Sequence, residues 1–124
     1  TIADSVHVAR VLRDAGLDLI DVSSAGNTPL SQPEYGRMYQ VPFAERIRSE
    51  VGMAVMAVGA IQGADHVNTL IASGRADLCA IARGHLSDPY LTLRATGEYD
   101  HFDHPWPKQY ELAQPRPRLE GRRR

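Results

Sequence analysis

Two short turns, each at the end of an apolar run, carry the residue types that could bind a phosphate. Arg83 and Gly84 follow the run at residues 78–82, and Gly59 stands near the end of the run at residues 53–61. Arginine supplies a permanent, forked positive charge, and glycine lets the backbone come close to a ligand. In α/β folds, ligands bind at the carboxyl ends of strands. Arg83 could equally pair with a surface carboxylate, so the pattern leaves both roles open.

The other chemically reactive residue types show no spacing that is typical of a site. His101 and His104 have no cysteine partners at zinc-site spacing, and we expect no metal site. His85 is the histidine nearest to the Arg83 turn, and we expect a surface or packing role for it. The single cysteine, Cys79, excludes an internal disulfide and favours a reducing compartment. No catalytic residue is therefore assigned.

Composition and charge exclude several classes of function. The chain has 124 residues, enough for one small domain, and 43% of them are hydrophobic, as in ordinary globular proteins. The net charge of −1 gives no electrostatic reason to expect a nucleic acid or a membrane surface as partner. No apolar run approaches the roughly 20 residues needed to span a membrane, and nothing resembles a secretory signal. These features favour a cytoplasmic protein.

Helix and strand patterns alternate along the chain. Short apolar runs predict strands at residues 17–22, 53–61 and 78–82. Amphipathic patterns and end signals predict helices at residues 5–15, 42–51, 63–73 and 89–96. In the first helix, Asp4 is the expected N-cap, and the buried stripe should consist of Val8, Val11, Leu12 and Ala15. The last helix should begin at Asp88 and Pro89, as an N-cap and a first helical residue.

The spacing of these elements predicts an α/β fold with parallel strands. Each strand-to-strand repeat is roughly 25–35 residues, the length of a βαβ unit. The strands are nearly continuous apolar runs, as parallel strands buried on both faces should be. A small open sheet and part of a (β/α)8 barrel both fit, but a barrel needs about 250 residues, so the chain could supply at most half. Three strands would leave two bare edges that invite association, which favours a fragment of something larger.

Two segments lack a regular period. The stretch at residues 28–41, before the second helix, is long for a loop; such loops are often functional, although a plain surface excursion fits equally well. Residues 98–124 contain four prolines and are predicted to be an irregular tail after a domain at residues 1–97. The aromatic side chains of Phe102, Trp106 and Tyr110 could fasten this tail to a surface.

Several segments together resemble the C-terminal part of the Old Yellow Enzyme family. They are LDLIDVSSAG, YQVPFAERIRSEVGMAVMAVGAI, SGRADLCAIARGHLSDPY and PKQY, in the family's order and spacing. The resemblance covers about residues 5–112 and implies an FMN-dependent NAD(P)H oxidoreductase on a (β/α)8 barrel. The three predicted strands would be the sixth, seventh and eighth, so that the chain forms the C-terminal half of the barrel. Residues 64–95 are most similar to the reductase-like half of bifunctional aryl-CoA hydroxylases, such as the salicylyl-CoA and 2-aminobenzoyl-CoA enzymes.

The resemblance implies four cofactor-binding residues. Gly59 and Ala60 match the turn after the seventh strand, whose backbone meets the FMN phosphate. Ala82 and Arg83 match the family's Gly-Arg pair after the eighth strand, with alanine in place of the usual glycine. One subgroup has an arginine two residues after the PxQY-like tail that reaches a neighbouring subunit. Leu112 stands at that position here, which argues against a shared site, although a homo-oligomer remains compatible.

The resemblance implies substrate-orienting and proton-donating residues on the fourth strand and flavin-contacting residues on about the third and fifth. This sequence does not contain those regions. We therefore expect the chain by itself to be inactive. The narrower resemblance implies an aromatic CoA thioester as the small-molecule substrate, with FMN as cofactor and NAD(P)H as reductant. Two alternatives stay open: a phosphate-binding barrel segment of a non-redox enzyme, and a non-catalytic half-barrel that serves assembly.

Overall fold

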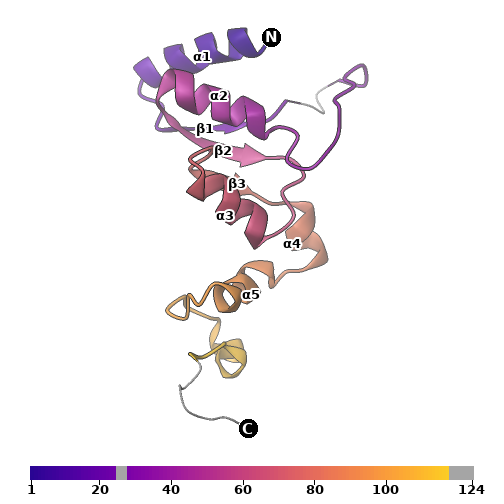
Figure 1. Ribbon diagram of the computed structural model, residues 1–124, viewed down its shortest axis with the longest axis vertical. Coiled ribbons are helices and arrows are strands. Elements are labelled where there is room, and N and C mark those ends of the chain that lie inside the picture. Colours follow the sequence, from indigo (N-terminus) through magenta and orange to yellow (C-terminus); the bar gives the residue numbers. More distant parts are fainter. Residues whose placement is uncertain (25–27, 118–124) are drawn as a thin grey trace. The chain divides into compact units, whose positions relative to one another are not determined.

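The computed structural model describes residues 1–24 and 28–117 (Figure 1). The elements in chain order are α1 (Ile2–Asp14), β1 (Leu19–Val22), α2 (Val41–Val51), β2 (Ala54–Val58), α3 (Ala64–Ala72), β3 (Leu78–Ala80), α4 (Arg83–Ser87), α5 (Leu91–Glu98) and the 3-10 helix η1 (Lys108–Ala113). The chain divides into two compact units, Thr1–Arg83 and Gly84–Arg124. The predicted domain boundary at residue 97 stays a prediction.

The first unit is built on a parallel sheet with the order β1-β2-β3. The register pairs Val22 with Ala57 and Val58 with Ala80. Helices α2 and α3 connect neighbouring parallel strands, as in βαβ units (Figure 1). The predicted α/β class and the parallel strand arrangement are confirmed.

One face of the sheet carries the hydrophobic core. Val55 and Ala57 of β2 are completely buried and cluster with Ile47 of α2 and Leu70 of α3. The opposite face is only partly covered: Leu78 is 52% exposed. The prediction that the strand at residues 78–82 is buried on both faces is therefore wrong for this chain, because its helices pack on one face only.

Helix α1 begins earlier than predicted and buries another face. Thr1, rather than Asp4, is the N-cap, and Asp4 completes a capping box with it. The buried residues of α1 are Val6 and Ala9. Val8, Val11 and Leu12, which were predicted to face inward, are exposed instead. The helix lies against α2, and the side of α1 that meets α2 is set by this packing.

β2 and β3 end earlier than their apolar runs suggested, whereas β1 ends at Val22 as predicted. β2 ends at Val58 because Gly59 and Ala60 both adopt left-handed backbone conformations. β3 ends at Ala80, and Arg83 begins the short helix α4, which the sequence did not predict. A continuous apolar run marks a strand but not the residue at which the chain leaves the sheet.

The second unit contains α5 and η1. Helix α5 begins at Leu91 rather than at Pro89, because Asp88 forms a turn in which its side chain accepts a hydrogen bond from the Tyr90 amide at 3.2 Å. The hydroxyls of Tyr90 and Tyr110 lie 3.1 Å apart with their rings edge to face, so Tyr110 fastens the tail as expected.

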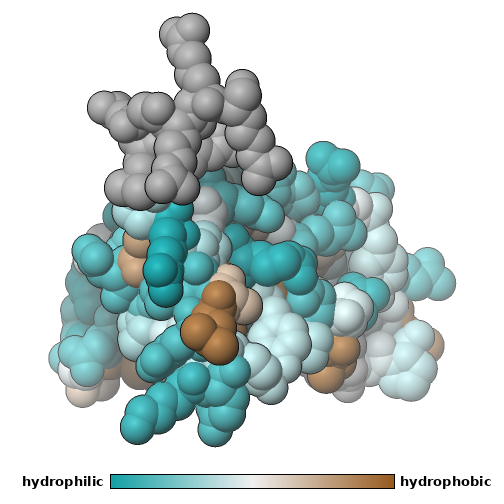
Figure 2. Space-filling view, turned by 90° about the horizontal axis from the view of Figure 1, so that it is seen from below, coloured by the Kyte–Doolittle hydropathy of each residue, from teal (hydrophilic) through white to brown (hydrophobic). Residues whose placement is uncertain are grey.

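Figure 2 shows hydrophobic residues scattered singly among hydrophilic ones on the face in view. Among the described helices, none has the length and apolar character to cross a membrane.

Candidate phosphate-binding site

The turn after the central strand has an unusual backbone. Gly59 has φ of +101° and Ala60 has φ of +53°. Left-handed conformations cost an ordinary residue roughly 1–2 kcal/mol, whereas glycine adopts them freely. A strained alanine beside a glycine at the carboxyl end of a parallel strand is typical of a functional turn. These are the two residues that the family resemblance places in this turn, and both have left-handed backbones.

A segment from the loop before α2 holds this turn in place. The amide of Met38 donates to the carbonyl of Ala60 at 3.3 Å, and Met38 is itself left-handed, with φ of +54°. The Gln40 side-chain amide donates to the Val58 carbonyl at 3.4 Å. A Cβ added to Gly59 would lie 2.3 Å from Nε2 of Gln40, so only glycine fits. Part of the long loop therefore has a structural task, and Met38 and Gln40 are site residues that the sequence reasoning missed.

Gln40 also reaches the end of the first strand. Its Oε1 accepts hydrogen bonds from the backbone amide of Ser24 and from the Ser24 hydroxyl, the latter at 2.9 Å. The hydroxyl of Ser23 lies 3.5 Å from the same oxygen. Two serines directly after a predicted strand were the one sequence signal for this contact. The carboxyl ends of β1 and β2 are thus joined through one side chain.

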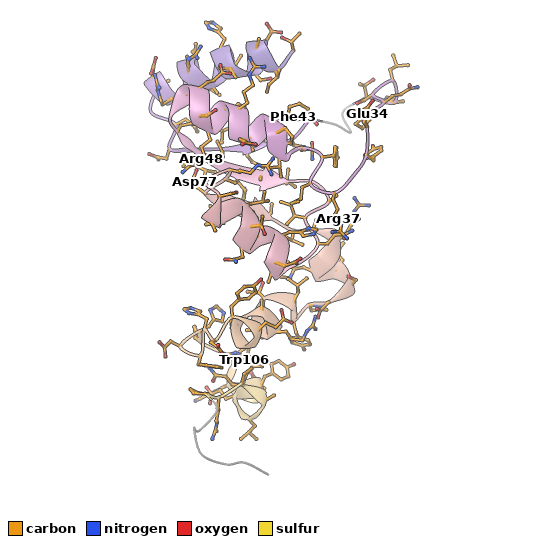
Figure 3. The ribbon with its side chains drawn as sticks, viewed as in Figure 1. Glu34, Arg37, Phe43, Arg48, Asp77 and Trp106 are labelled. Atoms are coloured by element: carbon orange, nitrogen blue, oxygen red, sulfur yellow. The ribbon has the colours of Figure 1, made fainter. Side chains whose placement is uncertain are left out.

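A cavity opens beside this junction. It has a volume of about 550 Å³ and lies between the end of β1 and the first turns of α1 and α2. Ser23, Ser24 and Phe43 line it, and Figure 3 labels Phe43 near the start of α2. The carboxyl edge of the sheet therefore has an open cavity next to the end of β1.

The second predicted turn leaves the sheet next to the first. The register pairs Val58 with Ala80, so the residues that follow these two strands emerge at the same edge. Ala82 and Arg83 are exposed, and Arg83 is the first residue of α4. The topology thus places the chain segments that carry Gly59, Ala60, Ala82 and Arg83 on neighbouring strand ends.

This edge has the chemistry that a phosphate needs. Glycine admits a close approach to the backbone, and an arginine supplies a fixed charge and a forked donor. Cys79 precedes this edge, and burial raises the pKa of its thiol, which makes it a poor nucleophile at neutral pH. Within the described residues there is no cluster of three or more side chains suited to a metal ion. The donors at this edge, backbone amides and one guanidinium, are compatible with an anion such as a phosphate.

Comparisons with known proteins show which family the chain is similar to. The sequence model of the NADH:flavin oxidoreductase / NADH oxidase family matches residues 1–100. An NADPH dehydrogenase of Geobacillus sp. (strain WCH70) is 42% identical over 98 residues, which are 79% of this chain and 28% of that protein. The NADPH dehydrogenase of Bacillus subtilis (strain 168) is 38% identical over 110 residues, 89% of this chain and 32% of that protein.

The chain therefore spans about three tenths of the length of these curated relatives. At the level of the family, the expected cofactor and reductant, FMN and NAD(P)H, are confirmed. The family match covers both units of the chain as far as residue 100, including both glycine-marked turns. The chain belongs to the NADH:flavin oxidoreductase / NADH oxidase family, which is the Old Yellow Enzyme family that its segments resemble.

Proposed function

We propose that this chain supplies the phosphate-binding edge of an FMN-dependent NAD(P)H oxidoreductase. The observation that carries the proposal is the left-handed pair Gly59 and Ala60 at the end of β2, beside the β3 end that leads to Arg83. Gly59, Ala60, Ala82 and Arg83 would hold the phosphate of FMN through backbone amides and one guanidinium. When bound, FMN supplies the hydride-transfer chemistry, and these residues anchor it.

The same proposal includes the larger architecture. The strands β1, β2 and β3 would be the sixth, seventh and eighth of a (β/α)8 barrel. Two observations support this: the sheet is parallel with one poorly covered face, and the chain matches only 28% and 32% of two relatives. A partly covered face such as that of Leu78 becomes the interior of a barrel once further strands close it.

Several finer assignments rest on sequence resemblance alone. The substrate would be a small electron-poor molecule, and the resemblance of residues 64–95 points to an aromatic CoA thioester. A cytoplasmic location agrees with the single cysteine, Cys79, and a homo-oligomer agrees with the bare strand edges. The chain alone should lack reductase activity, because the regions that carry the family's catalytic residues are not in this sequence.

The phosphate role is tested by comparing FMN with riboflavin, which lacks the phosphate. Equilibrium dialysis of the full chain should show a preference for FMN. Arg83→Ala should weaken FMN binding by roughly 10- to 150-fold, because a charge-assisted hydrogen bond contributes about 1.5–3 kcal/mol and about 1.4 kcal/mol is a factor of ten. Riboflavin affinity should stay the same.

The matched control is Arg46→Ala, which removes another exposed arginine, one that pairs with Glu50 on α2. It should leave both flavin affinities unchanged. If Arg83→Ala changes the two affinities equally, or changes neither, the phosphate site is wrong. A purified chain that oxidises NAD(P)H with an activated enone faster than free FMN does would refute the expected inactivity.

A further inference from the structure

We propose that Gln40 is a positioning residue that sets the direction of the backbone amides in the Gly59–Ala60 turn. This inference rests on the proposed phosphate site, and it assigns a role to a residue outside the four expected ligands. Gln40 is 4% exposed, one of the few buried polar residues of the described chain. It stands at the N-cap of α2, yet its side chain makes no capping hydrogen bond.

The side chain is instead used across the carboxyl edge of the sheet. Its oxygen accepts from Ser24 at the end of β1, and its nitrogen donates to the Val58 carbonyl at the end of β2. A buried amide keeps such hydrogen bonds because each unsatisfied group costs roughly 1–3 kcal/mol. When both the oxygen and the nitrogen of a side-chain amide are hydrogen-bonded, the amide has one orientation. The Gln40 side chain is therefore held in one position between β1 and β2.

The contact with Val58 determines where the next amide points. The carbonyl of Val58 and the N–H of Gly59 belong to one planar trans peptide, in which the two groups point in opposite directions. Because Gln40 holds the carbonyl, the Gly59 N–H must be directed away from Gln40. The Met38 amide holds the Ala60 carbonyl in the same manner, which directs the Ile61 N–H.

Steric contact reinforces the hydrogen bonds. A Cβ on Gly59 would lie 2.3 Å from Nε2 of Gln40 and 3.0 Å from Cε1 of Tyr39, so the loop and the turn are packed directly together. Both Met38 and Ala60 keep left-handed backbones while they are hydrogen-bonded to each other. Such strain persists only where the surroundings over-determine it, and it occurs most often at ligand sites. The segment at residues 38–40 therefore preorganises the turn for an anion.

The test uses Gln40→Met in the full chain, a change that keeps the length of the side chain and removes its hydrogen bonds to the serines after β1 and to Val58. Gln62→Met is the matched control, because Gln62 is exposed and only three residues beyond Gly59. The first measurement is hydrogen–deuterium exchange of residues 59–61. The second is the ratio of FMN to riboflavin affinity.

Gln40→Met should speed exchange at residues 59–61 by about tenfold and lower the FMN-to-riboflavin ratio by about tenfold, the effect of losing one aligned hydrogen bond. Gln62→Met should change neither quantity. Ser24→Ala is a milder variant that removes only the 2.9 Å hydroxyl contact to Gln40. It should lower the FMN-to-riboflavin ratio by a few-fold, and it replaces Gln40→Met in the test if that variant does not fold.

The outcomes separate the two proposals. A merely structural role for Gln40 predicts that FMN and riboflavin affinities fall together, and that result would overturn the positioning role. An unchanged ratio in both Gln40→Met and Ser24→Ala would also overturn it while the phosphate site stands. If the unsubstituted chain shows no preference for FMN, the phosphate site fails and the role of Gln40 in it fails as well, whatever the exchange rates.

Discussion

The guanidinium of Arg48 donates two hydrogen bonds to the carboxylate of Asp77, from Nε to Oδ2 at 3.0 Å and from Nη2 to Oδ1 at 2.9 Å (Figure 3). The same carboxylate accepts a hydrogen bond from the backbone amide of Val55 at 2.9 Å. Arg48 also donates a hydrogen bond to the Gly74 carbonyl at 2.8 Å. This group of contacts joins α2 to the beginnings of β2 and β3. It therefore fixes the edge of the sheet opposite to the candidate site.

Asp77 should make the stability of the chain sensitive to acid. The hydrogen bonds from Arg48, followed by that from the Val55 amide, hold the pKa of Asp77 below its ordinary value of 3.8. The stabilisation from ionised Asp77 is complete above that ordinary value and is lost as the pH falls through the lower pKa of the folded state. Asp77→Asn should therefore be less stable than the unsubstituted chain at pH 7, and the difference should shrink below about pH 4.

Urea unfolding at several pH values measures this difference. The control is Glu50→Gln, which removes the exposed ion pairs of Glu50 with Arg46 and with Arg10. Exposed pairs of this kind contribute about 0.3–0.5 kcal/mol, so this variant should behave nearly like the unsubstituted chain. A stability difference for Asp77→Asn that stays constant from pH 7 to pH 2 would contradict the assigned role of the carboxylate.

Gly59→Ala should be more destabilising than Gly52→Ala or Gly36→Ala. The new methyl would clash with Gln40, and φ of +101° is unfavourable for alanine. Strain of this kind costs on the order of 1–3 kcal/mol. Gly52→Ala separates the two causes, because Gly52 has φ of +72° but a Cβ there would meet no described atom within 4 Å.

Gly36→Ala provides the baseline, since Gly36 has neither a positive φ nor a near neighbour in the described structure. Its change in the free energy of unfolding should lie near zero or be slightly favourable. The expected order of destabilisation is Gly59, then Gly52, then Gly36. Equal values for Gly59→Ala and Gly52→Ala would mean that Gln40 does not pack against the turn.

Leu70→Ala should destabilise the first unit strongly. Leu70 is completely buried and packs in the core with residues of α2 and β2. Removing a buried leucine side chain costs about 2–5 kcal/mol, from lost transfer energy and the cavity that remains. Leu112→Ala is the matched control, because Leu112 is 96% exposed and should change stability by less than about 0.5 kcal/mol. Thermal unfolding of both variants decides whether α3 belongs to the core.

The isolated chain should associate in solution. β1 and β3 each have a sheet neighbour on one side only within the described chain, and the face that carries Leu78 is poorly covered. Bare strand edges and exposed apolar faces promote pairing between copies. Size-exclusion chromatography with light scattering should show species larger than one chain of 13.7 kDa. A compact monomer with one cooperative melting transition would instead indicate a self-sufficient open sheet.

The amino-acid sequence by itself determined the class of the fold, and it predicted where a ligand could bind. The spacing of apolar runs predicted three parallel strands with helices between them, and the structure has that order. Gly59 was noticed because glycine has a freely rotating backbone, and Arg83 because arginine always carries a charge. Both properties belong to the residue itself and do not depend on its neighbours. These features are local, so a pattern of nearby residues is enough to find them.

Only the tertiary structure decided which side chains cooperate. The buried face of α1 turned out to be that of Val6 and Ala9, because packing against α2, not the apolar stripe alone, chooses the side. Gln40 reaches Val58 across 18 residues of sequence, and Arg48 reaches Asp77 across 29. Contacts at such separations arise when the chain closes large loops to bury its core, and no local period of the sequence records which polar partners then meet.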